Sequence, residues 1–62
     1  MPNITIEIYE GRTVEQKRLL AREVTDAVVR AIGSKPEKVR IRIVDMKKHD
    51  VAWAGNLTCD QD

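Results

Sequence analysis

The sequence predicts an α/β subunit in which two parallel strands pack against one face of a single helix. Two runs of alternating apolar residues, separated by a long helical pattern, carry this prediction. The order strand, long helix, strand implies a parallel pair joined by a right-handed crossover. We expect one domain over residues 1–62, because 62 residues are too few for two hydrophobic cores.

The start of the chain has the pattern of a strand. Ile4, Ile6 and Ile8 alternate with polar residues, which predicts a strand from Asn3 to Tyr9. Pro2 is tolerated before it, because the first residue of a strand can do without a backbone donor.

A capping box marks the start of the helix. Thr13 fits the N-cap and Gln16 stands three residues later. The helix is expected to end near Ile32, with Gly33 directly after it. The apolar stripe recurs at spacings of three and four and consists of Leu20, Val24, Ala27, Val28 and Ala31, widened by Leu19 and Ile32.

A second alternating run predicts the second strand, from about Lys38 to Asp45. Its apolar residues alternate with Arg40 and Arg42, so both arginines are expected on the face away from the helix. After it, residues 51–56 fit a short hairpin and residues 57–62 a tail.

Composition excludes several classes of protein. The net charge of +1 lacks the basic excess typical of nucleic-acid binders. No apolar run is long enough for a transmembrane helix, and the start lacks a signal-peptide pattern, so we expect a cytoplasmic protein. His49 and Cys59 lack the spacing of metal ligands, and no Gly-rich phosphate loop is present. We therefore expect neither a metal nor a cofactor.

The small size predicts an oligomer. The chain has one cysteine and 3% aromatic residues, so neither a disulfide nor a large aromatic core can stabilise it. Two strands and one helix also leave sheet edges open. We expect a homo-oligomer larger than a dimer.

Pro2 and the arginines are the residues that suggest chemistry. Removal of Met1 would leave Pro2 as a secondary amine, and α-amino groups titrate near pH 8, within reach of a general base. Arg12, Arg40 and Arg42 suit bidentate binding of carboxylates. The alternatives are that Pro2 only stiffens the terminus and that the arginines are solvated or pair across an interface.

The pieces together resemble the 4-oxalocrotonate tautomerase family over nearly the whole chain. The resemblance is carried by Met1-Pro2, Glu10-Gly11-Arg12-Thr13, Glu15-Gln16-Lys17, Val39-Arg40, Met46 and Ala54-Gly55. It implies a β-α-β tautomerase-like subunit with a short C-terminal hairpin, which assembles as a hexamer, a trimer of dimers.

The same resemblance implies an enol–keto tautomerase for 2-hydroxymuconate-like dienols or related 2-oxo acids, of the kind used in aromatic hydrocarbon catabolism. Pro2, freed of Met1, would be the general base. Arg12 and Arg40 would bind carboxylates and stabilise the dienolate, with Arg40 from a neighbouring subunit. Nearby arginines would also lower the pKa of the Pro2 amine, because like charges disfavour its protonated form.

Several positions depart from the family pattern. Val51 stands where the family has an aromatic wall, and Trp53 is a replacement two residues later. Asn3, Tyr9 and Arg42 stand where apolar residues are common. These five residues are expected to line the substrate site.

The departures leave two further functions open. One is a hydration reaction of the dehalogenase type, for which Asp50 and Glu7 are the candidate water-activating acids. The other is a non-catalytic or partner subunit of a heterohexamer with a related chain. In that case Met1 would be retained and the Pro2 nitrogen would be an amide.

Overall fold

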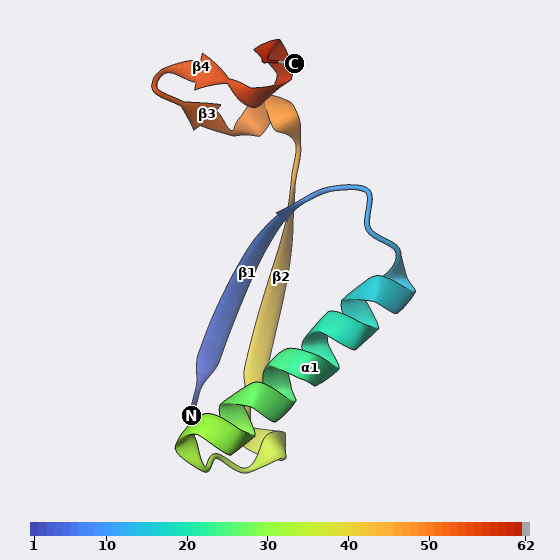
Figure 1. The fold of residues 1–62 in the computed structure, drawn as a ribbon, viewed down its shortest axis with the longest axis vertical. Helices are drawn as coiled ribbons and strands as arrows, with labels where there is room; N and C mark the ends of the chain where they lie inside the picture. Colours follow the sequence, from blue (N-terminus) through green and yellow to red (C-terminus); the bar gives the residue numbers. More distant parts are fainter. Residues whose placement is uncertain (62) are drawn as a thin grey trace.

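Two parallel strands and one long helix form the body of the subunit, and a small hairpin follows them (Figure 1). The computed structural model describes residues 1–61. In chain order the elements are β1 (Asn3–Tyr9), α1 (Val14–Ile32), η1 (Pro36–Lys38), β2 (Arg40–Met46), η2 (Lys48–Asp50), β3 (Ala52–Trp53), β4 (Asn56–Leu57) and η3 (Thr58–Asp60).

The strand pair is parallel, as predicted. It runs in register from Asn3 opposite Arg40 to Tyr9 opposite Met46. β2 begins two residues later than expected, because Lys38 belongs to the turn η1, where the Val39 N–H donates to the Pro36 carbonyl at 3.1 Å.

The predicted ends of α1 are confirmed. The Thr13 hydroxyl accepts from the Gln16 N–H at 3.1 Å, and the Gln16 side chain accepts from the Thr13 N–H at 2.9 Å. Gly33 takes the left-handed conformation with φ of 73° and donates to the Val29 carbonyl at 3.0 Å. Gly fits this position because it has no Cβ to clash.

The helix buries a narrower face than the sequence predicts. Leu20, Val24 and Val28 are half-buried. Leu19 is 51% exposed, because successive helical residues lie about 100° apart and Leu20 already faces the sheet. Ile32, in the last turn, is 67% exposed.

The other flank of the helix completes the buried face. Ala21 and Thr25 are half-buried there, whereas Ala27 and Ala31 on the opposite flank are exposed. The helix is therefore rotated toward Ala21 relative to the predicted stripe.

The hairpin is built on a two-residue turn. Ala52 pairs with Leu57 and Trp53 with Asn56. Ala54 and Gly55, between the strands, have φ of 52° and 84°. Positive φ at both central residues is the requirement of a type I′ turn. Leu57 thus belongs to β4 and not to the tail in which the sequence placed it.

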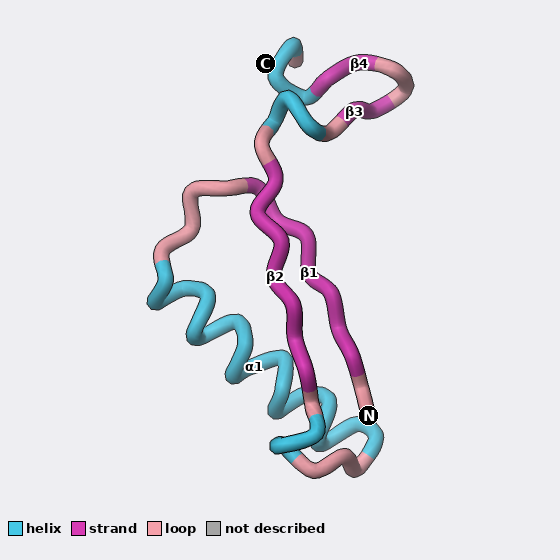
Figure 2. Tube along the Cα trace, turned by 180° about the vertical axis from the view of Figure 1, so that it is seen from behind, coloured by secondary structure: helices cyan, strands magenta, loops and turns pink. Residues whose placement is uncertain are grey.

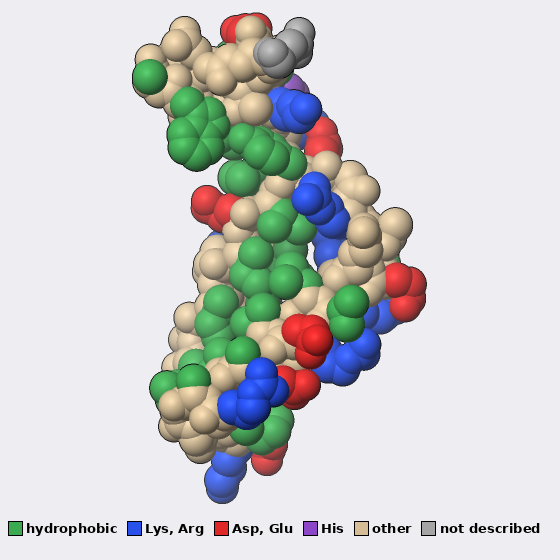
Figure 3. Space-filling model, in the orientation of Figure 1, with side chains coloured by type: hydrophobic (Ala, Val, Ile, Leu, Met, Phe, Trp, Pro, Cys, Tyr) green, Lys and Arg blue, Asp and Glu red, His purple; other side chains and the backbone are tan. Residues whose placement is uncertain are grey.

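The subunit has no closed core of its own. None of residues 1–61 is fully buried, and the molecule measures 42 × 25 × 14 Å. Its radius of gyration is 14.7 Å, against about 11 Å for a globular domain of this length. Figure 3 shows hydrophobic side chains in a continuous band from the hairpin down the strands. Within the described residues, no helix has the length and apolarity to cross a bilayer.

Candidate functional site

The predicted site residues lie in two groups at opposite ends of the strand pair. Pro2, Asn3 and Arg40 lie where the strands begin, and Tyr9, Val51 and Trp53 lie where they end, beside the hairpin. Figure 2 shows the N-terminus and the hairpin at the two ends of the sheet. Strands of seven residues separate the groups by about 23 Å.

Pro2 is held in place by its own carbonyl. The Arg40 N–H donates to the Pro2 carbonyl at 3.0 Å, and Arg40 is paired with Asn3. Side chains alternate along a strand, so the Arg40 guanidinium lies on the face of Asn3, and the Pro2 ring, one residue earlier, belongs to the other face. The backbone position of Pro2 is thus defined, but the Arg40 side chain of the same subunit does not face its ring.

The other two arginines lie elsewhere. Arg12 is exposed in the loop between β1 and α1, at the end of the sheet opposite to Pro2. Arg42 is exposed on β2 and pairs with Thr5, in the middle of the open face. Within one subunit, therefore, Pro2, Arg12 and Arg40 do not converge on one point.

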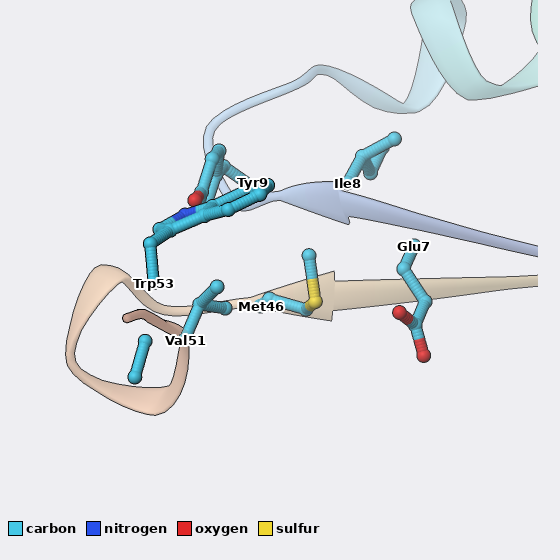
Figure 4. Close-up of a pocket in the computed structure, with 7 residues that line it drawn as sticks. Glu7, Ile8, Tyr9, Met46, Val51 and Trp53 are labelled. Carbon is cyan, nitrogen blue, oxygen red and sulfur yellow. The ribbon is translucent and has the colours of Figure 1, made fainter. Parts of the chain in front are cut away.

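A hollow beside the hairpin gathers the second group. We call it the hairpin hollow, and its volume is about 440 Å³. Figure 4 shows the Trp53 indole across the Tyr9 side chain, with Met46 beyond Val51 and Glu7 at the end farthest from the hairpin. Its lining residues are Glu7, Ile8, Tyr9, Met46, Val51, Ala52 and Trp53.

Hydrogen bonds fix the hairpin against the end of β1. The Tyr9 hydroxyl lies 3.2 Å from the Thr58 hydroxyl, which itself donates to the Val51 carbonyl at 3.0 Å. The Thr58 N–H donates to the same carbonyl at 2.8 Å. Tyr9 is thereby linked to both the start and the end of the hairpin segment.

The surroundings of Tyr9 favour its ionised form. The hydrogen bond with Thr58 is the main cause that lowers the pKa of Tyr9 below 10.0, and the indole N–H of Trp53 and the charge of Lys48 act in the same direction. Partial burial opposes them. The phenol oxygen is a polar point beside the apolar side chains of Val51 and Met46.

Among the described residues, the acidic side chains lie apart from one another. Asp50, in η2, has its carboxylate 3.7 Å from the His49 imidazole, while Glu7 lines the hairpin hollow. Asp45 forms an ion pair with Lys17 at 2.7 Å, which ties β2 to α1. Among residues 1–61, no three His, Cys, Asp or Glu side chains are grouped as metal ligands.

Ile8, Met46 and Ala52, which line the hollow, and Thr58, which is bonded to Tyr9, were not among the predicted site residues. Met46 faces the hollow because β2 extends to the residue opposite Tyr9, so one more residue of the predicted strand would have included it. No sequence pattern marks Thr58, because its hydrogen bond with Tyr9 joins residues that are 49 positions apart.

Comparison with known proteins gives one consistent result. The family model described as tautomerase enzyme matches residues 2–61. The 2-hydroxymuconate tautomerase of Bacillus subtilis is 42% identical over 62 residues, which cover the whole of both chains.

Solved structures agree with the computed fold. YwhB, a homologue of 4-oxalocrotonate tautomerase, is 41% identical with a TM-score of 0.94, over 98% of this chain and 100% of its own. A heterohexamer 4-oxalocrotonate tautomerase from Chloroflexus aurantiacus is 27% identical with a TM-score of 0.90, over the whole of both chains. The β-α-β subunit with a parallel strand pair and a short hairpin is thus the fold of these relatives.

Proposed function

Since this chain belongs to the tautomerase enzyme family, we propose that it is an enol–keto tautomerase acting on 2-hydroxymuconate-like dienols or related 2-oxo acids. A relative with 42% identity carries the name 2-hydroxymuconate tautomerase, which supports this substrate class. The observation that carries the proposal is the family match from residue 2 onward, which begins at a proline whose backbone is fixed by β2.

Pro2, once Met1 is removed, is the general base in this proposal. Its amine takes the proton from the 2-hydroxyl group of the substrate, and the carbonyl forms as the double bonds shift. The amine then returns the proton to a carbon atom of the substrate. Because the same proton is removed and returned, this isomerisation balances without a cofactor. A base held in place near both positions gains from proximity, and proton transfer of this kind is worth about 10²–10⁴-fold in rate.

Arg12 and Arg40 are proposed to bind the carboxylates and to stabilise the negative charge of the dienolate. Fixed cations directed at developing charge stabilise a transition state strongly. Arg12 lies at the far end of its own sheet, so the copy that acts beside Pro2 must come from another subunit. The Arg40 guanidinium lies on the opposite face from the Pro2 ring, which supports its donation by a neighbour as well.

The active form is proposed to be a hexamer built as a trimer of dimers. One relative is described as a heterohexamer, so a related chain is a second option for the partner. The open strand edges, the exposed apolar side chains and the separation of the site residues all support assembly.

The proposal is tested by following ketonisation of 2-hydroxymuconate and phenylenolpyruvate by ultraviolet absorbance, on protein whose intact mass shows loss of Met1. Pro2→Ala is expected to lower kcat by about 100-fold or more, because a freely rotating primary amine replaces the secondary amine that the proline ring holds in place. The oligomer should persist, since the Pro2 carbonyl that accepts from Arg40 remains.

Near-normal turnover by Pro2→Ala would contradict the role of Pro2. Retention of Met1 in the native protein, together with no turnover, would instead favour a non-catalytic partner subunit. The control is Glu37→Gln, which changes an exposed residue of η1 and accounts for effects of preparing a variant protein.

A further inference from the structure

We infer that the hairpin hollow makes this chain selective for a 2-oxo acid enol with one carboxylate and an aryl or similarly flat apolar tail, in preference to a dicarboxylate. The inference rests on the proposed function, in which the end of the sheet that carries both Arg12 and the hollow lies beside Pro2 of a neighbouring subunit. It assigns Trp53 and Glu7 as the residues that determine specificity. Neither residue is required for the proton transfer itself.

The walls of the hollow suit a flat apolar group. Trp53 is 63% exposed and its indole borders the hollow, so one aromatic face is available for stacking. Aromatic pairs prefer offset or edge-to-face contacts, and the Met46 thioether on the neighbouring wall favours ring edges. The volume of about 440 Å³ falls within the range of about 300–1,000 Å³ of small-molecule sites.

The charge of the hollow disfavours a second carboxylate. Glu7 is the only carboxylate among the lining residues, which include no lysine, arginine or histidine. No lysine or arginine among residues 1–61 lies within ion-pair distance of it. A carboxylate that the tail of a diacid carries to the Glu7 end of the hollow would meet this like charge, whereas the Lys48 charge acts at the Tyr9 end.

The hairpin holds these walls in a fixed position. The bonds that join Tyr9, Thr58 and Val51 fasten both ends of the hairpin segment to β1. The two-residue turn at Ala54 and Gly55 then sets the direction of the Trp53 strand. A wall fixed in this way loses little conformational freedom when a ligand binds.

The kinetic test compares kcat/KM for phenylenolpyruvate with that for 2-hydroxymuconate across variants. Trp53→Ala should lower the value for the aryl enol by about five- to tenfold and that for the diacid by less than about twofold, because only the aryl tail stacks on the indole. Trp53→Phe should keep the wild-type ratio. Glu7→Gln should raise the ratio of kcat/KM for the diacid to that for the aryl enol by about fivefold, whereas the matched control Glu37→Gln should leave this ratio unchanged.

Equal losses for both substrates in Trp53→Ala, or a diacid that is indifferent to Glu7→Gln, would overturn the inference. If the wild-type protein converts neither enol, the proposed function fails, and a binding measurement decides the specificity of the hollow separately.

That measurement uses the single tryptophan of the chain. Non-reactive 3-phenylpropanoate and adipate are titrated while the Trp53 emission is followed. We expect 3-phenylpropanoate to change the emission at a concentration at least about fivefold lower than adipate. Equal or tighter binding of adipate would overturn the inference whether or not the protein is catalytically active.

Discussion

At the scale of single residues, the Val51 carbonyl and the Tyr9 phenolate are alternative acceptors for the hydroxyl proton of Thr58. The Thr58 hydroxyl donates to the Val51 carbonyl while the Tyr9 phenol is neutral, and the phenol can then donate to Thr58. When Tyr9 ionises, Thr58 can turn its only proton to the phenolate. The Val51 carbonyl stays satisfied, because the Thr58 N–H still donates to it at 2.8 Å.

The hydrogen bond from Thr58 to the phenolate predicts a lowered pKa for Tyr9, the only tyrosine of the chain. The ultraviolet absorbance of the phenolate should show a pKa below 10.0 in the folded protein. Thr58→Val should raise that pKa toward 10.0, because the donor to the phenolate is lost. Thr25→Val, which removes a hydroxyl bonded to the Ala21 carbonyl in α1, is the matched control and should leave the titration unchanged.

The sign of the linked stability change follows from the same shift. A pKa that is lower in the folded state than in the unfolded state stabilises the fold above the unfolded pKa, and this contribution is lost as the pH falls through the folded pKa. Ionised Tyr9 therefore holds the hairpin more firmly at high pH. An unaltered Tyr9 titration in Thr58→Val would contradict the assigned hydrogen bond from Thr58 to the phenolate.

At the scale of elements, the capping box is the feature of α1 with a clear energetic value. Two reciprocal bonds between Thr13 and Gln16 satisfy backbone donors at the start of the helix. Thr13→Ala removes the side-chain acceptor and should lower the free energy of unfolding by about 1 kcal/mol per subunit. Thr13→Ser keeps the hydroxyl and should restore most of that loss.

Urea unfolding at one fixed protein concentration measures this effect, because dilution alone changes the stability of an oligomer. A loss of equal size in Thr13→Ala and Thr13→Ser would show that the methyl group, not the hydroxyl, stabilises this end of the helix.

Elements with a strong local signal were predictable from the sequence. Alternation located β1, and the Thr13 box with Gly33 located both ends of α1. The rotation of α1 was not predictable, because Leu19 and Ile32 are as apolar as the residues that face the sheet. Periodicity shows that a stripe exists, whereas the sheet decides which residues of a broad stripe it covers.

The site was predictable only in part, for a related reason. The resemblance identified Tyr9, Val51 and Trp53, and the structure places all three around one hollow. The separation of Arg12 from Pro2 depends on the direction of two paired strands, and the bond from Thr58 to Tyr9 depends on where the hairpin folds back. Neither is encoded in the spacing of nearby residues.

At the scale of the whole molecule, the exposed surface indicates that the subunit is not independent. The accessible surface is 4,993 Å², against about 4,100 Å² for a folded monomer of this mass. The excess of about 900 Å² is close to the roughly 800 Å² that each partner buries in a standard protein interface. Leu19 and Ile32, each more than half exposed, are apolar groups that a neighbour can cover.

We therefore predict that folding and assembly are coupled. Sedimentation equilibrium should give a mass close to six times the 7.1 kDa subunit, and the midpoint of thermal unfolding should fall with each dilution of the protein. This dependence follows because assembly stabilises the folded chain by mass action. A folded 7.1 kDa species whose unfolding midpoint is independent of concentration would contradict the prediction. It would also separate Pro2 from Arg12 permanently, since one subunit holds them at opposite ends of its sheet.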